Sequence, residues 1–410
     1  MKSTVKENLP IGIIGAGPIG MAAAAHLYKQ SLPFCVFELG NQVGTNFLDY
    51  SHVRLFSPWR YNIDPASKEI LKKNGWDEPV EKRLPYAGDI YNEYLYPLSK
   101  TPELEPYIYL NSKVVSVGRK YMDKRKTRER SSNPFMIKTI QDGSLKNYEV
   151  SAIIDASGIW KNPNPLISGG YYFPIEEELK DSIFYGIPDV LDKDKDRYEG
   201  KHTLVVGSGH SAINTVIQLG KLKNKTSDTS ISWAVRKSDF SFVSALSRNQ
   251  FLAQYKLGEK IEKLMNEQQI DVFSSFFIED LNEFSGKISV IGTNKERIEK
   301  VDQIVANTGS RPNIDIFREI QYSLHPAFEC VEGLSEILFP KNGVVPSHGE
   351  RLLRHMEKDF YVIGSKSYGR ASSFFLTNGF EQARSIAAYL AGEIKESEEI
   401  LIKFPDKWLN

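Results

Sequence analysis

Short apolar runs that end at glycine-rich turns recur along this chain and predict buried strands. The first run, Ile11–Ile14, leads through a glycine turn into a helix-compatible stretch, about Ile19–Gln30, and then into a second apolar run, Phe34–Glu38. Continuous apolar runs of this length suit parallel strands that are covered on both faces. A strand–helix–strand succession opens a doubly wound sheet. The N-terminal part of the chain therefore predicts an α/β fold.

The same succession returns near the middle of the chain. The run Leu204–Val206 precedes a second glycine-rich turn, and Ile231–Lys237 supplies the next strand. Two further apolar runs, at 150–158 and 301–309, each end in a small-residue turn. We interpret these runs as the closing strands of two units, with the second unit inserted into the first.

The pattern predicts two doubly wound, Rossmann-like domains of three layers each. We expect one domain to comprise residues 1–188 and 312–410, and the inserted domain to comprise residues 189–311. The charged stretch Asp189–Lys201 is the expected connection into the inserted domain. A chain of 410 residues is long enough for two such domains.

Each glycine-rich turn resembles the G-x-G-x-x-G pattern of dinucleotide-binding sites. The first reads Gly15-Ala16-Gly17-Pro18-Ile19-Gly20, and the second reads Gly207-Ser208-Gly209-His210-Ser211-Ala212. The first glycine permits the tight turn, the second lets a diphosphate approach the backbone, and the third lets the helix pack on the strand. The start of the helix then holds the phosphate charge. Two such motifs predict two dinucleotide sites and electron transfer between them.

The residues that end each second strand make the two sites unequal. Glu38 stands 23 residues after Gly15, where an acidic side chain accepts hydrogen bonds from ribose hydroxyls. Arg236 and Lys237 stand at the corresponding place in the second unit, and cations there suit the 2′-phosphate of NADP. The alternatives are a solvated acidic strand end and an ordinary basic one.

Composition and charge exclude several other functions. Lysine plus arginine and aspartate plus glutamate number 52 each, so no net field favours nucleic acid or an anionic membrane. The basic stretch 119–130 is interpreted as a solvated loop between two strands, with a nucleic-acid or membrane patch as the alternative. No apolar run approaches the roughly 18 residues of a membrane span. A polar N-terminus then leads us to expect a cytoplasmic protein.

Cysteine and histidine usage excludes a cysteine redox centre and gives no support for a metal site. Cys35 and Cys330 are the only cysteines and lie far apart, which excludes a disulfide framework and a C-x-x-C centre. Cys35 lies in an apolar run and is interpreted as a small core residue. The seven histidines show no metal-ligand spacing, so we expect no metal.

From Ile11 to about Gly392, the chain resembles the two-dinucleotide-binding-domain flavoproteins. This resemblance implies FAD in the first site and NADPH in the inserted second one. Thioredoxin and disulfide reductases of that superfamily need a redox cysteine pair, which is missing here. Ferredoxin-reductase-like members need none, and neither do the class B flavin monooxygenases, which the chain resembles most.

The resemblance to class B monooxygenases rests on one further segment. These enzymes carry an F-x-G-x-x-x-H-x-x-x-(W/Y) signature just before the second glycine turn. Phe184 and Gly186 match the signature, but Val190 stands at the histidine position and Asp194 at the aromatic one. Residues of this segment help to place the nicotinamide cofactor in that group, so the departure bears directly on oxygenation.

The resemblance also implies contacts with the flavin. Trp59 would shield the flavin ring, and Arg60 would stabilise a flavin anion or contact NADPH, with packing or a surface turn as the alternative for each. The backbone of Val114 would contact the adenine. In Gly364-Ser365-Lys366, Lys366 or Ser365 replaces the aspartate that relatives place on the ribityl chain.

The expected cofactor-binding residues are therefore spread over both units, and no catalytic side chain is assigned. They are Gly15, Gly17, Pro18, Ile19, Gly20, Glu38, Leu39, Trp59, Arg60, Val114, Ser157, Gly158, Gly207, Ser208, Gly209, His210, Ser211, Arg236, Lys237, Thr308, Gly309, Gly364 and Lys366.

Three functions fit these features. The favoured one is an NADPH-reduced, FAD-dependent monooxygenase that uses O2 through a flavin C4a-hydroperoxide on a small nitrogen- or sulfur-containing nucleophile or a carbonyl compound. The second is an NAD(P)H reductase that passes electrons to a quinone, an iron–sulfur protein or a small oxidant, which suits Val190 and the altered Gly-Asp site. The third is a non-catalytic nucleotide-binding protein, against which both glycine motifs argue.

Overall fold

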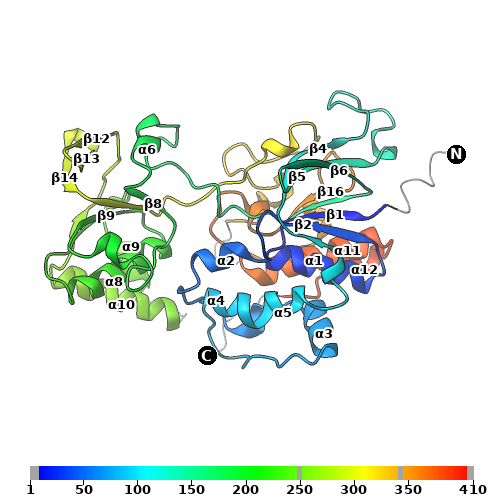
Figure 1. The fold of residues 1–410 in the computed structure, drawn as a ribbon, viewed down its shortest axis with the longest axis horizontal. Coiled ribbons are helices and arrows are strands. Elements are labelled where there is room, and N and C mark those ends of the chain that lie inside the picture. The colour runs from blue at the N-terminus through cyan, green and yellow to red at the C-terminus, as the bar shows by residue number, and fades with distance from the viewer. Residues whose placement is uncertain (1–8, 247–251, 340–344, 404–410) are drawn as a thin grey trace. The chain divides into compact units, whose positions relative to one another are not determined.

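The computed structural model describes residues 9–246, 252–339 and 345–403, and these form two compact units (Figure 1). Each unit is built around a five-stranded parallel sheet. The second unit is inserted into the first, so the predicted α/β architecture is confirmed.

The border between the units differs from the prediction on one side. Unit 2 comprises residues 163–310, and unit 1 comprises the described residues on either side of it. The chain therefore enters unit 2 at Pro163 and not at Asp189, because β8 (Ile183–Tyr185) pairs with β15 (Gln303–Ala306) in the sheet of unit 2. The stretch after β8 is not a linker, since Val190 and Tyr198 within it are fully buried.

The sheet of unit 1 has β1 at its centre and the strand order β16-β7-β1-β2-β3. All neighbouring strands run parallel. The five strands are β1 (Ile11–Ile14), β2 (Phe34–Phe37), β3 (Ile108–Tyr109), β7 (Ile153–Asp155) and β16 (Phe360–Val362). Every residue of β1 is buried, as a strand covered on both faces requires.

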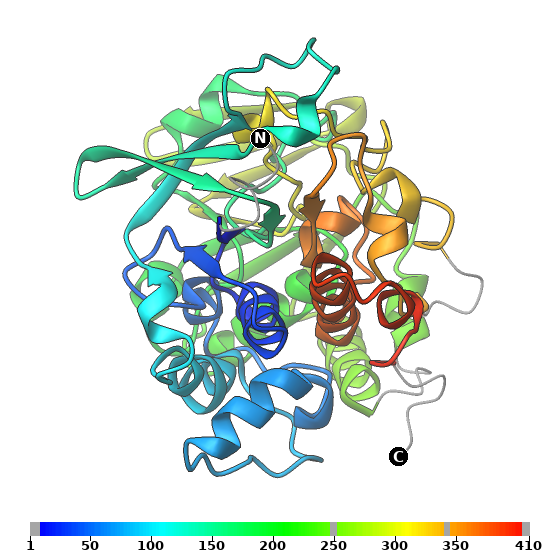
Figure 2. The same cartoon turned by 90° about the vertical axis from the view of Figure 1, so that its right-hand side faces the viewer.

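Two helices cover one face of this sheet, and a small antiparallel sheet covers the other. The helices α1 (Pro18–Lys29) and α11 (Leu376–Leu390) lie side by side (Figure 2). Their close packing uses Gly379, where a Cβ would lie 2.5 Å from Ile19 Cδ1. On the opposite face, a Cβ on Gly12 of β1 would lie 2.7 Å from Ile137 Cδ1. Ile137 belongs to the sheet formed by β4 (Ser112–Arg119), β5 (Phe135–Gln141) and β6 (Ser144–Val150).

The short helices of unit 1 are α2 (Thr45–Asp49), α3 (Pro65–Lys73), α4 (Ala87–Asp89), α5 (Tyr96–Ser99) and α12 (Ile394–Glu398).

Unit 2 has the same three layers, with the strand order β11-β10-β9-β15-β8. Its further parallel strands are β9 (His202–Val206), β10 (Ser230–Ala234) and β11 (Asp271–Phe273). The helices α8 (His210–Lys223) and α10 (Leu252–Asn266) pack together in one layer. The short helix α9 (Ser241–Leu246) packs against α10. The antiparallel strands β12 (Asp280–Phe284), β13 (Lys287–Ile291) and β14 (Arg297–Val301) pack in one apolar cluster with β9. Two short helices, α6 (Pro174–Glu178) and α7 (Lys195–Tyr198), flank β8.

A buried ion cluster anchors the basic segment between β4 and β5. The Nε atoms of Arg119 and Arg130 donate to the two carboxylate oxygens of Glu357 at 2.8 and 2.7 Å. The Arg119 guanidinium also lies 3.5 Å from the centre of the Phe135 ring. The predicted solvated loop is therefore correct for residues 124–129 and wrong for its two ends, which are buried because Glu357 and backbone carbonyls satisfy both guanidinium groups.

None of the helices in the described ranges has the length and apolar character needed to cross a membrane.

Glu357→Gln tests how much this ion cluster stabilises unit 1. The substitution leaves two buried guanidinium groups without their counter-charge, so we expect the free energy of unfolding of this unit to fall by about 3–5 kcal/mol. Urea-induced unfolding followed by tryptophan fluorescence measures the change. Glu69→Gln is the matched control, because Glu69 pairs with Lys29 on the surface and should contribute less than about 1 kcal/mol. Equal effects of the two substitutions would contradict the expectation.

Candidate functional site

The first candidate site lies at the carboxyl end of β1, where the glycine turn enters α1. Gly15 has a φ of 95°, and a Cβ on it would lie 2.8 Å from Ser157 Cα. A Cβ on Gly20 would lie 1.9 Å from the carbonyl oxygen of Gly15. By contrast, a Cβ on Gly17 would meet no atom within 4 Å. The backbone therefore requires glycine at 15 and 20, whereas Gly17 leaves open space before the start of the helix.

Pro18 and Ile19 are buried residues that fix the position of the first turn of α1. Pro18 is the first residue of the helix, where its missing N–H has no intrahelical partner to lose. The Ile19 side chain lies against Gly364 and Gly379, so it faces α11. Both residues are buried. They position the helix N-terminus, where the first N–H groups of a helix have no intrahelical partner and can bind a ligand.

Glu38 follows β2 and is tied to the glycine turn. Its carboxylate accepts hydrogen bonds from the N–H groups of Ala16 at 2.7 Å and Gly40 at 2.8 Å. A carboxylate has about four acceptor positions, so it can still accept from a ligand hydroxyl. Leu39 beside it is 60% exposed. The carbonyl of Glu38 accepts from Ser112 N at 2.7 Å, which brings the strand of Val114 to the same end of the site.

The segment Gly364–Tyr368 after β16 forms a 3₁₀ helix that reaches the end of β7. Lys366 Nζ lies 2.6 Å from Asp155 Oδ2 and donates to Ser157 Oγ at 3.0 Å. Both Lys366 and Asp155 are almost completely buried. Ser365 is half-buried, and its Oγ lies 3.7 Å from where a Cβ on Gly158 would be. Of the two residues predicted to replace the aspartate of Gly-Asp, Ser365 therefore has the open position, and Lys366 is engaged inside the unit.

Trp59 and Arg60 lie on a short 3₁₀ turn, Trp59–Tyr61, next to the start of α11. The link is a hydrogen bond of 3.0 Å from Thr377 Oγ1 to the carbonyl of Tyr61. Trp59 is fully buried, and its indole Nε1 has no hydrogen-bond partner among the described residues. The Arg60 guanidinium lies 4.8 Å from the centre of the Tyr61 ring. Trp59 thus carries a buried donor without an acceptor, which is uncommon unless a ligand completes the site.

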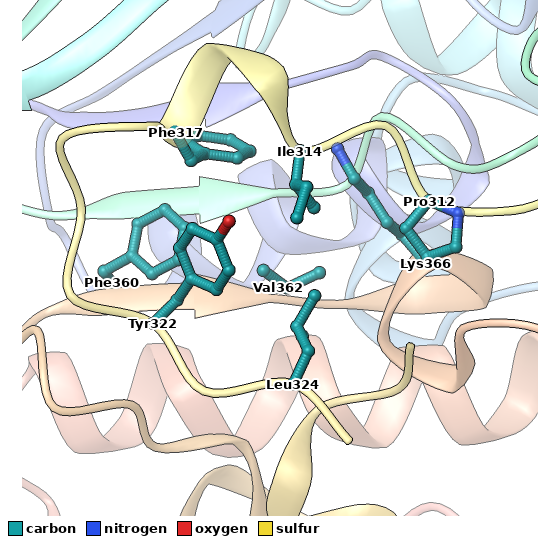
Figure 3. A pocket seen from close by; sticks show the side chains of 8 residues that line it. All are labelled: Pro312, Ile314, Phe317, Tyr322, Leu324, Phe360, Val362 and Lys366. Atoms are coloured by element: carbon teal, nitrogen blue, oxygen red, sulfur yellow. The ribbon is translucent and has the colours of Figure 1, made fainter. Parts of the chain in front are cut away.

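Unit 1 contains a small cavity (Figure 3). Its volume of about 10 Å³ suits one water molecule and no organic substrate. The Lys366 ammonium lies 5.1 Å from the centre of the Phe317 ring on its wall. The lining residues are Pro312, Ile314, Phe317, Tyr322, Leu324, Phe360, Val362 and Lys366. This cavity is therefore no candidate for a substrate pocket.

The second candidate site repeats the same geometry at the carboxyl end of β9. Gly207 has a φ of 128°, and a Cβ on it would lie 2.3 Å from the carbonyl oxygen of Asn307. A Cβ on Gly209 would meet no atom within 4 Å. Ser208 lies between these two glycines, and His210 and Ser211 are the first residues of α8. The buried Trp233 fixes the turn, because its Nε1 donates to the carbonyl of Gly207 at 2.8 Å.

Two exposed cations follow β10, at the position that corresponds to Glu38. The Arg236 guanidinium lies 3.5 Å from the carbonyl oxygen of Ser168, and Lys237 Nζ lies 4.2 Å from the centre of the Phe242 ring. Both contacts are made by the charged groups, and both residues remain exposed to solvent. An anionic group beside the second glycine turn would therefore meet two positive charges.

The turn that follows β15 links Gly186, from the segment after β8, to the second glycine turn. Thr308 Oγ1 donates to the carbonyl of Asn164 at 2.6 Å, and the backbone carbonyl of Gly309 accepts from Asn164 N at 2.9 Å. Asn307 Nδ2 donates to the carbonyl of Gly186 at 2.6 Å, while its buried Oδ1 has no partner in the described part of the chain. Val190 packs in the core. Asn307 is not among the residues predicted for either site, because an asparagine after an apolar strand is a common turn residue.

The two cysteines have no role in either site. Cys35 and Cys330 are both buried and unpaired. Burial raises the pKa of the Cys35 thiol to about 12, so it stays protonated and unreactive at neutral pH. Among the described residues, no group of three or more histidine, cysteine, aspartate or glutamate side chains is placed to hold a metal ion.

The chain is similar to flavin-dependent enzymes of several kinds. It is 23% identical to the flavin-containing monooxygenase 1 of Mus musculus over 232 residues, which cover 55% of this chain and 41% of that protein. The bacillithiol disulfide reductase of Staphylococcus aureus matches with a TM-score of 0.65 and 18% identity over 94% of this chain and 99% of that one. The ornithine N-hydroxylase of Kutzneria sp. 744 matches with a TM-score of 0.61 and 12% identity, over 94% and 99% of the two chains.

The chain thus spans less than half the length of the mouse monooxygenase, whereas its matches cover 99% of each of the two solved structures. These structural matches show the fold. A family model matches residues 12–328, which include both glycine turns and the whole of unit 2. The chain belongs to the pyridine nucleotide-disulphide oxidoreductase family.

Proposed function

We propose that this protein is an FAD-dependent oxidoreductase that is reduced by NADPH and oxygenates a small nitrogen- or sulfur-containing substrate. The observation that carries the proposal is the difference between two equivalent strand ends. Glu38 follows β2 in unit 1, and Arg236 and Lys237 follow β10 in unit 2. An acid at this position suits a free ribose, and cations suit a 2′-phosphate. The two units thus suit different dinucleotides, as electron transfer from NADPH to FAD requires.

The residues of unit 1 fit FAD. The open space at Gly17 and the N-terminus of α1 suit a diphosphate, and Glu38 retains acceptors for ribose hydroxyls. The buried Trp59 Nε1 is a donor that a bound cofactor would satisfy. When bound, FAD would supply the redox chemistry, that is, hydride acceptance and reaction with O2. The protein holds, orients and shields the cofactor.

The residues of unit 2 fit NADPH. Gly209 leaves open space before α8 for a diphosphate, as Gly17 does before α1. Arg236 and Lys237 provide the charge for the 2′-phosphate, and the buried Asn307 Oδ1 is an acceptor without a donor beside the same turn. The site of unit 2 therefore favours NADPH over NADH.

Two observations bear on where the electrons go. The similarity to a flavin-containing monooxygenase supports oxygenation, and the name of the ornithine N-hydroxylase points to a nitrogen-containing substrate. The second candidate function is an NAD(P)H reductase for a quinone, an iron–sulfur protein or a small oxidant. It is favoured by Val190, which is buried in the core and stands where the class B monooxygenase signature has its histidine. We propose oxygenation as the main function.

The fate of oxygen separates these two functions. The FAD-loaded protein is mixed with NADPH and O2 in the presence of L-ornithine, cadaverine or N,N-dimethylaniline. For a monooxygenase, we expect one of these amines to yield its hydroxylamine or N-oxide in near-equal amount to the NADPH consumed. Product analysis by mass spectrometry and a peroxide assay measure the balance. Quantitative hydrogen peroxide without product, together with fast anaerobic reduction of menadione, would instead establish the reductase function.

Alanine at the two open glycines tests which unit binds which cofactor. Gly17 and Gly209 have extended backbone conformations that alanine adopts without strain, so both variants should unfold at temperatures close to that of the unmodified protein. The added methyl groups occupy the space proposed for the diphosphates. We expect Gly17→Ala to raise the Kd for FAD at least tenfold and Gly209→Ala to raise the KM for NADPH to a similar extent. A loss of FAD from Gly209→Ala alone would show that the assignment of the two units is reversed.

Arg236→Ala tests the assignment of the 2′-phosphate. A charge-assisted hydrogen bond contributes about 1.5–3 kcal/mol, so we expect the KM for NADPH to rise about tenfold or more while that for NADH changes less than about twofold. Steady-state oxidation of both nucleotides measures the ratio. Lys225→Ala, an exposed cation beyond the other end of α8, is the matched control and should leave both values unchanged. Equal increases for NADPH and NADH in Arg236→Ala would refute the assignment.

A further inference from the structure

A buried ion pair lies directly behind an exposed serine at the first glycine turn. Asp155 ends β7 and is completely buried, and Lys366 from the segment after β16 is 2% exposed. Their charged atoms, Oδ2 and Nζ, are 2.6 Å apart. Ser157 follows two residues after Asp155 and is exposed. Its Cα lies 2.8 Å from where a Cβ on Gly15 would be, so Ser157 adjoins the turn itself.

The ion pair orients Ser157 through two hydrogen bonds. Asp155 Oδ1 accepts from the backbone N–H of Ser157 at 3.1 Å, which fixes the turn. Lys366 Nζ donates to Ser157 Oγ at 3.0 Å. The remaining side of the ammonium faces Phe317, whose ring centre is 5.1 Å away. The lysine charge is therefore balanced by Asp155 and is not available to a ligand.

The direction of the Lys366 hydrogen bond determines what Ser157 can do. An ammonium group has donors only, so the hydroxyl oxygen of Ser157 must act as its acceptor. The hydroxyl proton must then point away from Lys366. A hydroxyl whose oxygen already accepts a bond from a cation is also a stronger donor than a free one, because chains of hydrogen bonds polarise one another. Ser157 thus presents an oriented, polarised O–H group beside Gly15.

We propose that the Ser157 hydroxyl donates a hydrogen bond to the diphosphate of the dinucleotide bound at the first glycine turn, and that Lys366 is the positioning residue that orients this hydroxyl. The inference rests on the proposed FAD site of unit 1. Asp155 balances the charge of the buried lysine and holds its ammonium in place. Lys366, which the sequence placed among the cofactor contacts, acts through Ser157 and does not touch the cofactor.

Binding of FAD and of ADP to the apoprotein tests this role, because ADP carries the diphosphate without the flavin. We expect Ser157→Ala to raise both dissociation constants about tenfold, and Ser157→Thr, which keeps the hydroxyl, to stay within twofold of the unmodified protein. The double variant Asp155→Asn with Lys366→Met removes both buried charges together, which avoids a lone buried charge. It should raise both constants about fivefold. Isothermal titration calorimetry measures the constants, and thermal unfolding of each apoprotein checks its fold.

The combination of variants isolates the path through Ser157. In a protein that already carries Ser157→Ala, the double variant should add less than a twofold change, because the hydroxyl on which Lys366 acts is absent. Ser151→Ala, before β7, removes a hydroxyl that bonds the Pro10 carbonyl and should have no effect on either ligand. A further fivefold loss in the Ser157→Ala background, or unchanged ADP binding by Ser157→Ala, would overturn the inference. Failure of the unmodified protein to bind FAD, with ADP binding that still depends on Ser157, would overturn the proposed function and support the inference.

Discussion

The close approach of two parallel strand ends is the constraint on which both candidate sites depend. At Gly15 the backbone lies so near Ser157 that no side chain fits, and Gly207 is in the same position against Asn307. This contact brings the glycine turn and the closing turn of each sheet together at one edge. The groups proposed to hold a dinucleotide all lie at the carboxyl ends of the strands. They are the helix N-termini, the charged residues that follow the second strand of each unit, and Ser157.

Much of the fold follows from local patterns in the sequence. The strands around β1, β9 and their glycine turns are short apolar runs with adjacent glycines, and such runs have few alternatives to a buried parallel strand. The inserted arrangement also follows, because the closing strands repeat one pattern. The difference between Glu38 and Arg236 is visible in the sequence because it depends on residue type at a fixed distance from a motif. Its meaning for cofactor choice stays a prediction.

Other features depend on contacts between distant residues. The sequence around β8 does not show whether this strand extends the first sheet or the second, since only its pairing with β15 decides that. From the sequence, Lys366 is predicted to replace a cofactor-binding aspartate. In the structure it pairs with Asp155, which lies 211 residues earlier in the chain. The burial of Arg119 and Arg130 likewise depends on Glu357, which lies beyond the whole of unit 2. Composition alone suggests solvent exposure for Arg119 and Arg130.

The insertion of unit 2 also has a consequence for the order in which the protein is made. Unit 2 is one continuous stretch, whereas unit 1 needs β16, α11 and Glu357 from beyond residue 310 to complete its sheet, its helical layer and its ion cluster. On the ribosome, the residues up to 162 emerge before β16 and Lys366, so β7 is then unpaired on one side and Asp155 lacks its cation. Unit 2 can therefore fold while the first half of unit 1 still waits for its partners. The chain at that stage has an open sheet edge, which can pair with another chain.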